Sequence, residues 1–295
     1  MSKIIKIKKG LNINLLGEAD KTLTTISSSN YAVKPTDFIG VFPKMLVKTG
    51  DVVKAGTPLF YDKYRENIIF TSPVSGKIGE IKRGEKRVLQ EIQISADAEI
   101  KYEEFKKAAT GSISKEEIIE TLLKSGVWPF IKQRPYSIIA DPKDEPKAIH
   151  ISAFDSSPLA PDFDFILHGK GEEFQAGIDI VAKLTSGKVH LNCNSENTKS
   201  KVFLNSQNVQ LNQFSGPHPA GNVGIQIHHI DPINKGDIVW VLNPQAVLTI
   251  GRLFLEGKYD ATKVVALTGA EVKNPKYYKI INGCTVEAIV KDNIN

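Results

Sequence analysis

The residues best suited to chemistry lie in one stretch, Phe214–Pro232, which reads FSGPHPAGNVGIQIHHIDP. It holds three of the six histidines of the chain, together with three glycines and three prolines. Proline fixes φ, while glycine permits unusual backbone angles and lets another backbone or a ligand come close. The residues that shape the motif are Gly216, Pro217, Pro219, Gly221 and Gly224. Functional residues are over-represented on loops held by a rigid scaffold, so we expect a shaped loop that presents His218.

Three interpretations of the histidines compete. A metal site could use His218, His228, His229 and Asp231. However, Ile225 and Ile227 alternate with Gln226, which predicts a short strand on which His228 and His229 point to opposite faces. A general acid or base role for His218 is open, since a free imidazole titrates near neutrality, but no nucleophile or partner carboxylate adjoins it in sequence. The third interpretation, loop histidines that satisfy backbone groups or face a partner, is favoured; we predict no catalytic residue and no metal.

Composition limits the remaining classes of function. With 295 residues the chain is long enough for two domains, and its net charge of +5 is modest. Basic clusters at Lys3–Lys9 and Lys82–Arg87 lack interleaved aromatic residues, so we expect no nucleic-acid partner. Cys193 and Cys284 have no CxxC partners, which excludes an internal four-cysteine cluster and favours a reducing compartment. No apolar run is long enough to span a bilayer and no signal peptide opens the chain, so we expect a cytoplasmic or peripheral protein.

Residues 1–100 are predicted to form an all-β domain. Short runs of Val, Ile and Phe alternate with turn residues between Pro43 and Ile94, in two halves that resemble each other. This pattern resembles the biotinyl/lipoyl domain, the barrel-sandwich hybrid, in which a lysine at the tip between the halves is acylated. Asp62 and Lys63 occupy that place here. A solvated turn lysine is the favoured interpretation, because Arg65 and Glu66 make the tip unlike a modification site.

A helix and an aromatic segment follow. Ser114 with Glu117 forms a capping box, and Gly126 ends the helix. Next comes VWPFIKQRP, in which Trp128, Phe130 and Arg134 are bounded by prolines. These side chains either line a pocket through stacking and cation–π contacts or fill the join between helix and sheet.

Residues 101–257 are predicted to form a Rossmann-like α/β domain, because β-branched strands alternate with helices in a parallel or mixed sheet. The expected strands are Ser137–Ala140, Ala148–Ser152, Phe163–Leu167, Lys188–Asn192 and Asp237–Leu242. The expected helices are Glu172–Leu184 and one that starts at Pro244.

The domain lacks a nucleotide motif. The best candidate for a glycine-rich phosphate loop is His168-Gly169-Lys170-Gly171, but Glu172 and Glu173 follow where phosphate would lie. Two carboxylates there would repel a pyrophosphate, although they suit the helix dipole. There is no Walker A, GxSxG or HExxH sequence either. The scaffold is predicted to hold no nucleotide.

Residues 258–295 are predicted to start a small β-grasp-like domain, with a turn at Thr268–Ala270, a corner at Pro275 and a helix at Thr285–Val290. The unit is short for a core of its own, so we expect the sequence to be cut from a longer protein.

Six motifs stand in one order: DVVKAGTPLFYDK, SPVSGKIGEIKRGEKRVL, LLKSGVWPFIKQRP, ISAFDSSPLAPD, FSGPHPAGNVG with IHHIDP, and VALTGAEVKNP. Together they resemble the A subunit of the Na+-translocating NADH:quinone oxidoreductase, over essentially the whole chain. More distantly the chain is similar to the C subunit of the Rnf complex and to the flavin-binding subunit of respiratory complex I. Those relatives carry a flavin/NADH site or cysteine clusters that this chain lacks.

The resemblance implies a peripheral subunit on the cytoplasmic side of the bacterial inner membrane, docked on the other pump subunits and chiefly on the membrane-embedded B subunit. It implies an NADH:quinone reductase, active as a complex and coupled to Na+ transport, in which this chain alone is not catalytic. It also implies no tightly bound cofactor, quinone as a ligand, and a C-terminal helical part that is absent here. On chemistry and motif position we assign the quinone slot to Trp128, Phe130, Arg134 and His218.

Three alternatives stay open. The same residues could form an interface between subunits, where aromatic residues and arginine are also enriched. The N-terminal domain could act as an acyl- or biotin-carrier module, or the chain could be a stand-alone flavin or nucleotide oxidoreductase.

Overall fold

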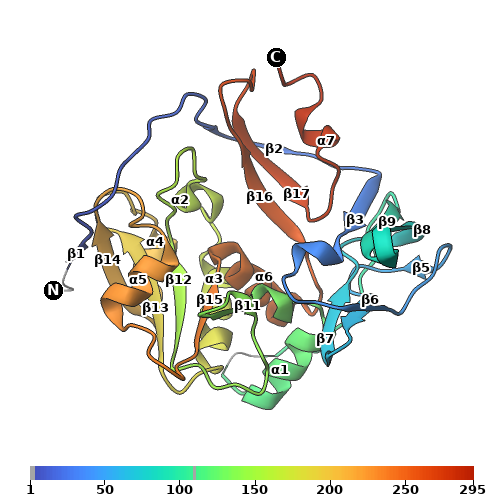
Figure 1. Cartoon of the computed structure of the whole chain (residues 1–295), viewed down its shortest axis with the longest axis horizontal. Coiled ribbons are helices and arrows are strands. Elements are labelled where there is room, and N and C mark those ends of the chain that lie inside the picture. The colour runs from blue at the N-terminus through green and yellow to red at the C-terminus, as the bar shows by residue number, and fades with distance from the viewer. Residues whose placement is uncertain (1–3, 109–110) are drawn as a thin grey trace.

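The computed structural model describes residues 4–108 and 111–295, and Figure 1 shows their arrangement. The architecture is the predicted one: a β domain, then an α/β domain, then a small third unit.

The N-terminal β domain consists of two sheets packed face to face. One has the order β3 (Asn30–Val33), β9 (Leu89–Ala96), β8 (Gly76–Arg83) and β5 (Val52–Val53). The other has the order β4 (Pro43–Met45), β6 (Pro58–Asp62) and β7 (Arg65–Thr71). Buried residues alternate with exposed ones at the start of β8, while β6 buries the adjacent Leu59 and Phe60, and Phe60 stacks on Phe70 at 4.5 Å in the core. The prediction of an all-β domain from short strands and regular turns, and its resemblance to a barrel-sandwich hybrid, are therefore confirmed.

The central sheet of the α/β domain has seven strands. Their order is β1 (Ile4–Lys6), β14 (Gln210–Ser215), β13 (Lys188–Asn194), β12 (Ala148–Ser152), β15 (Val239–Leu242), β10 (Lys132–Arg134) and β11 (Ile138–Ile139). The first five are parallel to one another, β10 pairs antiparallel with β15, and β11 pairs antiparallel with β10. The edge strand β1 comes from the start of the chain, so the N-terminal segment joins this sheet before crossing to the other units (Figure 1).

Helices cover both faces of this sheet. The apolar face, with Ile149 and Leu191, packs on α3 (Gly171–Ala182) and α6 (Pro244–Glu256). The opposite face carries polar side chains under α5 (Val223–Ile230). The short helices α2 (Phe163–Ile166) and α4 (Lys201–Leu204) lie in the connections. Helix α1 (Lys115–Lys124) begins with the predicted capping box, in which Ser114 and Glu117 bond each other's backbone.

Two expected strands are helices instead. Phe163–Leu167 is α2, because Asp162 accepts hydrogen bonds from the backbone N–H groups of Asp164 and Phe165 and caps a turn. The Ile225–Ile227 alternation lies in α5, where the Asn222 side chain caps the helix at the N–H of Gly224. In both places the short apolar run is compatible with the period of a strand and with that of a helix. The capping side chain stabilises the helix, so the helix forms.

The third unit is a three-stranded sheet in the order β16 (Thr262–Leu267), β17 (Lys276–Ile281) and β2 (Asp20–Thr25), followed by α7 (Glu287–Val290). Strand β2 comes from the N-terminal segment and runs parallel to β17. Within residues 4–108 and 111–295 no helix combines the length and apolarity that crossing a bilayer requires.

Candidate functional site

A cavity of about 540 Å³ opens where the strand order of the central sheet reverses. After β12 the chain adds β13 and β14 on one side and then returns to place β15 on the other side of β12. In open α/β sheets ligands bind in the crevice outside the carboxyl ends of the strands at such a switch point. Ser152 ends β12 and Leu242 ends β15, and both line the cavity. We call it the switch-point cavity.

The lining of the switch-point cavity is apolar with a few convergent polar groups, which is typical of sites for small organic ligands. Its apolar residues are Phe130, Phe154, Phe163, Val223, Val241, Leu242, Pro244 and Ala246. Its polar side chains include Lys132, Ser152, Asp155, His218 and Asn243. Two of the four residues predicted for a quinone slot, Phe130 and His218, therefore meet here, together with Gly221 of the motif loop.

Trp128 lies elsewhere. Its side chain is fully buried, its indole Nε1 donates to the carbonyl of Ala140 at 2.8 Å, and its ring meets that of Trp240 edge-on at 5.5 Å. These contacts place it in the join between the short helical turn Trp128–Phe130 and the sheet, which was the competing interpretation of the aromatic segment.

Arg134 also lies away from the cavity. Strand β10 runs antiparallel to β15, so Lys132 pairs with Val241 near the carboxyl end of β15 while Arg134 pairs with Val239 at its start. The cation at the cavity is thus Lys132, which the sequence patterns did not single out. The pKa of Lys132 is lowered from its usual value, mainly because the side chain is buried and to a smaller extent because the positive charge of Arg65 repels it. The Nε atom of Arg134 is buried without a hydrogen-bond partner in the described part of the chain.

His218 is held on three sides. Its Nδ1 lies 3.0 Å from the Ser156 hydroxyl, its backbone N–H donates to Asn12 Oδ1 at 2.9 Å, and its carbonyl accepts from the backbone N–H of Leu11 at 3.0 Å. The sequence alone offered no partner for this imidazole, because Ser156 is distant in sequence and meets the ring only in the folded chain.

Two glycines of the motif, Gly216 and Gly221, permit a close approach of another backbone, whereas a Cβ at Gly224, which lies in α5, would make only an ordinary contact with Asn222 Oδ1 at 3.7 Å. A side chain at Gly221 would collide with the backbone of Ser156, and one at Gly216 would collide with the carbonyl of Ile7. Gly216 and Gly221, which flank the Pro217–Pro219 segment, therefore allow the His218 loop to pack closely against Ile7 and Ser156.

The metal hypothesis has no geometric support in the described residues. His228 and His229 lie on the exposed end of α5, a helix and not the expected strand, with their rings edge-on at 5.3 Å. Among residues 4–108 and 111–295 no group of three or more His, Cys, Asp or Glu side chains could hold a metal ion.

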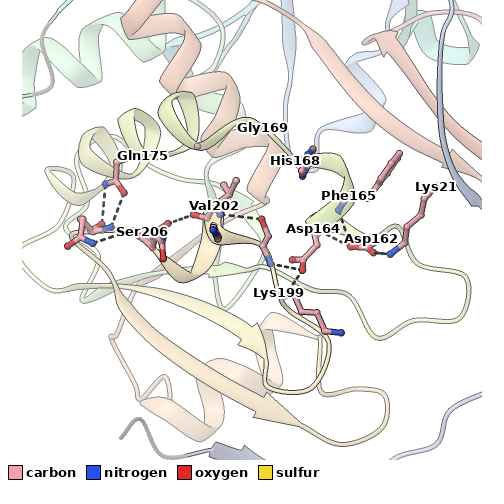
Figure 2. Close-up of a pocket in the computed structure, with 15 residues that line it drawn as sticks. Lys21, Asp162, Asp164, Phe165, His168, Gly169, Gln175, Lys199, Val202 and Ser206 are labelled. Carbon is pink, nitrogen blue, oxygen red and sulfur yellow. Dashed lines mark hydrogen bonds and ion pairs between the residues drawn. The ribbon is translucent and has the colours of Figure 1, made fainter.

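A larger cavity of about 960 Å³ lies between α2, α3 and α4 and includes His168, Gly169 and Gly171 of the glycine-rich turn (Figure 2). Several of its polar groups already form ion pairs or hydrogen bonds within the chain. Lys21 pairs with Asp162 at 2.5 Å, and the Asp164 carboxylate accepts from the backbone N–H groups of Lys199 and Ser200. Glu172 and Glu173 occupy the first turn of α3 as predicted. We therefore rank this larger cavity behind the switch-point cavity as a ligand site.

The tip between the two halves of the β domain is the β6–β7 hairpin, with Lys63 and Tyr64 in the turn. The Asp62 carboxylate is buried, where it accepts from Arg65 Nε at 2.9 Å and from the backbone N–H groups of Phe42 and Tyr64. Arg65 also donates to the carbonyl of Ile139 at 3.0 Å, so the tip is tied to the α/β domain.

Three family models match successive parts of the chain. They are described as the NqrA N-terminal barrel-sandwich hybrid domain at residues 5–97, the NqrA second alpha/beta domain at 113–259 and the NQRA C-terminal domain at 264–295.

Curated relatives are named as the A subunit of the Na(+)-translocating NADH-quinone reductase. The one from Neisseria meningitidis serogroup B is 38% identical over 289 residues, covering 97% of this chain and 64% of that one. The one from Yersinia pestis is 39% identical over 275 residues, covering 92% and 61%. The chain thus spans less than two-thirds of the length of these relatives.

Two solved structures of an NAD+-reducing [NiFe]-hydrogenase are also similar. The H2-reduced form has a TM-score of 0.38 at 16% identity, covering 52% of this chain and 33% of that one. The air-oxidized form has a TM-score of 0.39 at 13% identity, covering 66% and 44%.

Proposed function

The chain belongs to the NqrA family, the A subunits of the Na+-translocating NADH-quinone reductase, and we propose that it acts as a peripheral subunit that helps to bind quinone without a redox cofactor of its own. It would dock on the cytoplasmic side of the bacterial inner membrane against the other subunits, chiefly the B subunit. The reductase reaction and Na+ transport would belong to the assembled complex.

The observation that carries the quinone role is the convergence of Phe130 and His218 in the switch-point cavity. A quinone ring is flat and apolar with two carbonyl acceptors, so it needs an apolar slot and one or two donors. Phe130, Phe154 and Phe163 supply apolar surface, and the His218 imidazole can supply a donor. Lys132 also lines the cavity, with its ammonium 5.4 Å from the centre of the Phe38 ring. The lowered pKa of Lys132 reflects how far this ammonium is removed from water, which strengthens a hydrogen bond to an acceptor.

Calorimetric titration of the chain with a short-chain, water-soluble ubiquinone analogue tests this role. We expect saturable binding that His218→Ala and Phe130→Ala weaken about tenfold or more, by analogy with buried interface anchors. Phe42→Ala is the matched control, because Phe42 is an exposed phenylalanine of the β domain that does not line the cavity. Absence of saturable binding, or equal effects of Phe130→Ala and Phe42→Ala, would contradict a quinone site here.

A purely assembling role is the second candidate, and one surface feature favours it. The N-terminal segment that anchors His218 exposes four aliphatic side chains, Leu11, Ile13, Leu15 and Leu16, with Leu16 82% exposed. Exposed apolar patches on soluble surfaces mark interaction sites. If this patch docks on another part of the pump, a Leu11→Ser, Leu16→Ser variant should fail to co-purify with the remaining subunits while its quinone titration is unchanged.

A further inference from the structure

The Ser156 hydroxyl has a defined set of hydrogen bonds. The backbone N–H of Gly221 donates to Ser156 Oγ at 2.8 Å, which occupies one acceptor position. The hydroxyl proton then needs an acceptor, and His218 Nδ1, at 3.0 Å, is the acceptor that the described residues provide. If Nδ1 accepts, the neutral imidazole carries its proton on Nε2.

With respect to the residues that the structure describes, the second ring nitrogen of His218, Nε2, is free to bind a ligand. His218 lines the switch-point cavity, and Nε2 makes no hydrogen bond to any residue in the described part of the chain. The backbone of His218 is fixed at the same time by Asn12 and Leu11. A ring held at its backbone and at Nδ1 keeps its second nitrogen at one place in the cavity.

We propose that Ser156 is a positioning residue that holds His218 in the Nε2–H tautomer, so that the cavity offers a neutral N–H donor to a carbonyl oxygen. The class of ligand follows: flat molecules with a carbonyl acceptor at their edge, in preference to molecules that present only N–H donors. The inference rests on the proposed function for the identity of the ligand, but the tautomer itself is a property of the free protein.

Nitrogen-15 NMR of the histidine-labelled chain without ligand, at about pH 8 where a free imidazole is neutral, tests the tautomer directly. The resonances that His218→Gln removes should show an unprotonated Nδ1 and a protonated Nε2. Ser156→Ala should move both resonances towards a mixture of tautomers. Ser156→Thr, which keeps the hydroxyl, should restore the pattern, and Ser157→Ala, the adjacent serine, should leave it unchanged.

A protonated Nδ1 in the wild-type chain, or an unchanged spectrum in Ser156→Ala, would overturn the proposal. Titration with the ubiquinone analogue separates it from the proposed function. We expect Ser156→Ala to weaken binding about three- to tenfold, the effect of one misdirected hydrogen bond. The expected tautomer in a chain that binds no quinone would refute the proposed function alone, whereas quinone binding with Nδ1 protonated would refute this inference alone.

Discussion

The imidazole rings of His150 and His190 stack 4.4 Å apart, at an interplanar angle of 21°, on the neighbouring parallel strands β12 and β13. His150 is fully buried and His190 is 5% exposed. His190 Nδ1 lies 3.2 Å from the Asn212 amide, whereas neither ring nitrogen of His150 has a hydrogen-bond partner in the described part of the chain. Two imidazoles in such a place must be neutral in the folded protein.

Acid should therefore unfold the protein through this pair. Burial lowers the pKa of His150 to about 3, helped by repulsion from His190, and lowers the pKa of His190 to about 4. Between these values and about 6.5 the unfolded chain binds the extra protons, so the stability is full above pH 6.5 and falls as the pH falls. We expect urea denaturation to show a free energy of unfolding lower at pH 5 than at pH 7.5 by up to about 2 kcal/mol for each histidine.

His150→Leu should remove about half of this pH dependence and should not lower the stability at pH 7.5, because it replaces a buried unpaired polar group with an apolar one. Ile149→Val, at the preceding residue of the same strand, is the control: it should reduce stability by about 0.5–1.5 kcal/mol, equally at both pH values. An unchanged pH dependence in His150→Leu would show that other groups govern acid unfolding.

The α3–α6 crossing should not tolerate a methyl group. A Cβ at Gly251 would fall on the carbonyl oxygen of Glu173, and one at Gly177 would fall on that of Val247. We expect Gly251→Ala to destabilise the protein by about 1–3 kcal/mol, because backbone must move to make room. Gly171→Ala, at the open start of α3, meets no atom within 4 Å and should be neutral or stabilising by up to about 1 kcal/mol. Equal thermal midpoints for the two variants would contradict the close crossing.

Trp128 should matter for stability and not for ligand binding. We expect Trp128→Phe to lower the free energy of unfolding by about 1–3 kcal/mol, since it leaves the buried carbonyl of Ala140 without its donor and removes packing against Trp240. The affinity for the ubiquinone analogue should stay within about twofold, a change well below the effect of losing one hydrogen bond. Phe130→Leu should instead weaken binding of the ubiquinone analogue with little effect on the free energy of unfolding. A loss of affinity in Trp128→Phe would show that Trp128 contributes to the quinone site.

Breaking the Asp62–Arg65 pair should destabilise the β6–β7 tip. Arg65→Met leaves a carboxylate that is 1% exposed without its cation, and removing one partner of a buried pair costs about 3–5 kcal/mol. The double variant with Asp62→Asn should recover most of this loss. Lys63→Met, in the turn itself, should change stability by less than about 0.5 kcal/mol, as surface substitutions do. If Arg65→Met alone is as stable as the wild type, the pair does not hold the tip.

Much of the fold could be predicted from local patterns. Short runs of Val, Ile and Phe with regular turns specify the β domain, the Ser114 capping box starts α1, and Pro244 starts α6. Local patterns failed where a short apolar run fits both periods, as at Phe163–Leu167 and Ile225–Ile227, because a single capping side chain then decides. The family resemblance was recognised from six motifs that occur in one order along the chain, and no single residue would have been sufficient for it.

The composition of the site depended on the tertiary structure. The sequence by itself selected the His218 loop and the aromatic segment, because glycine, proline and aromatic residues in those patterns act locally. Only the fold decided that Phe130 and His218 share a cavity, that Lys132 takes the place expected of Arg134, and that Ser156 and Asn12 fix His218. The physical reason is that strand order and antiparallel pairing determine which ends of distant segments meet, and neither is encoded in the spacing of residues along one segment.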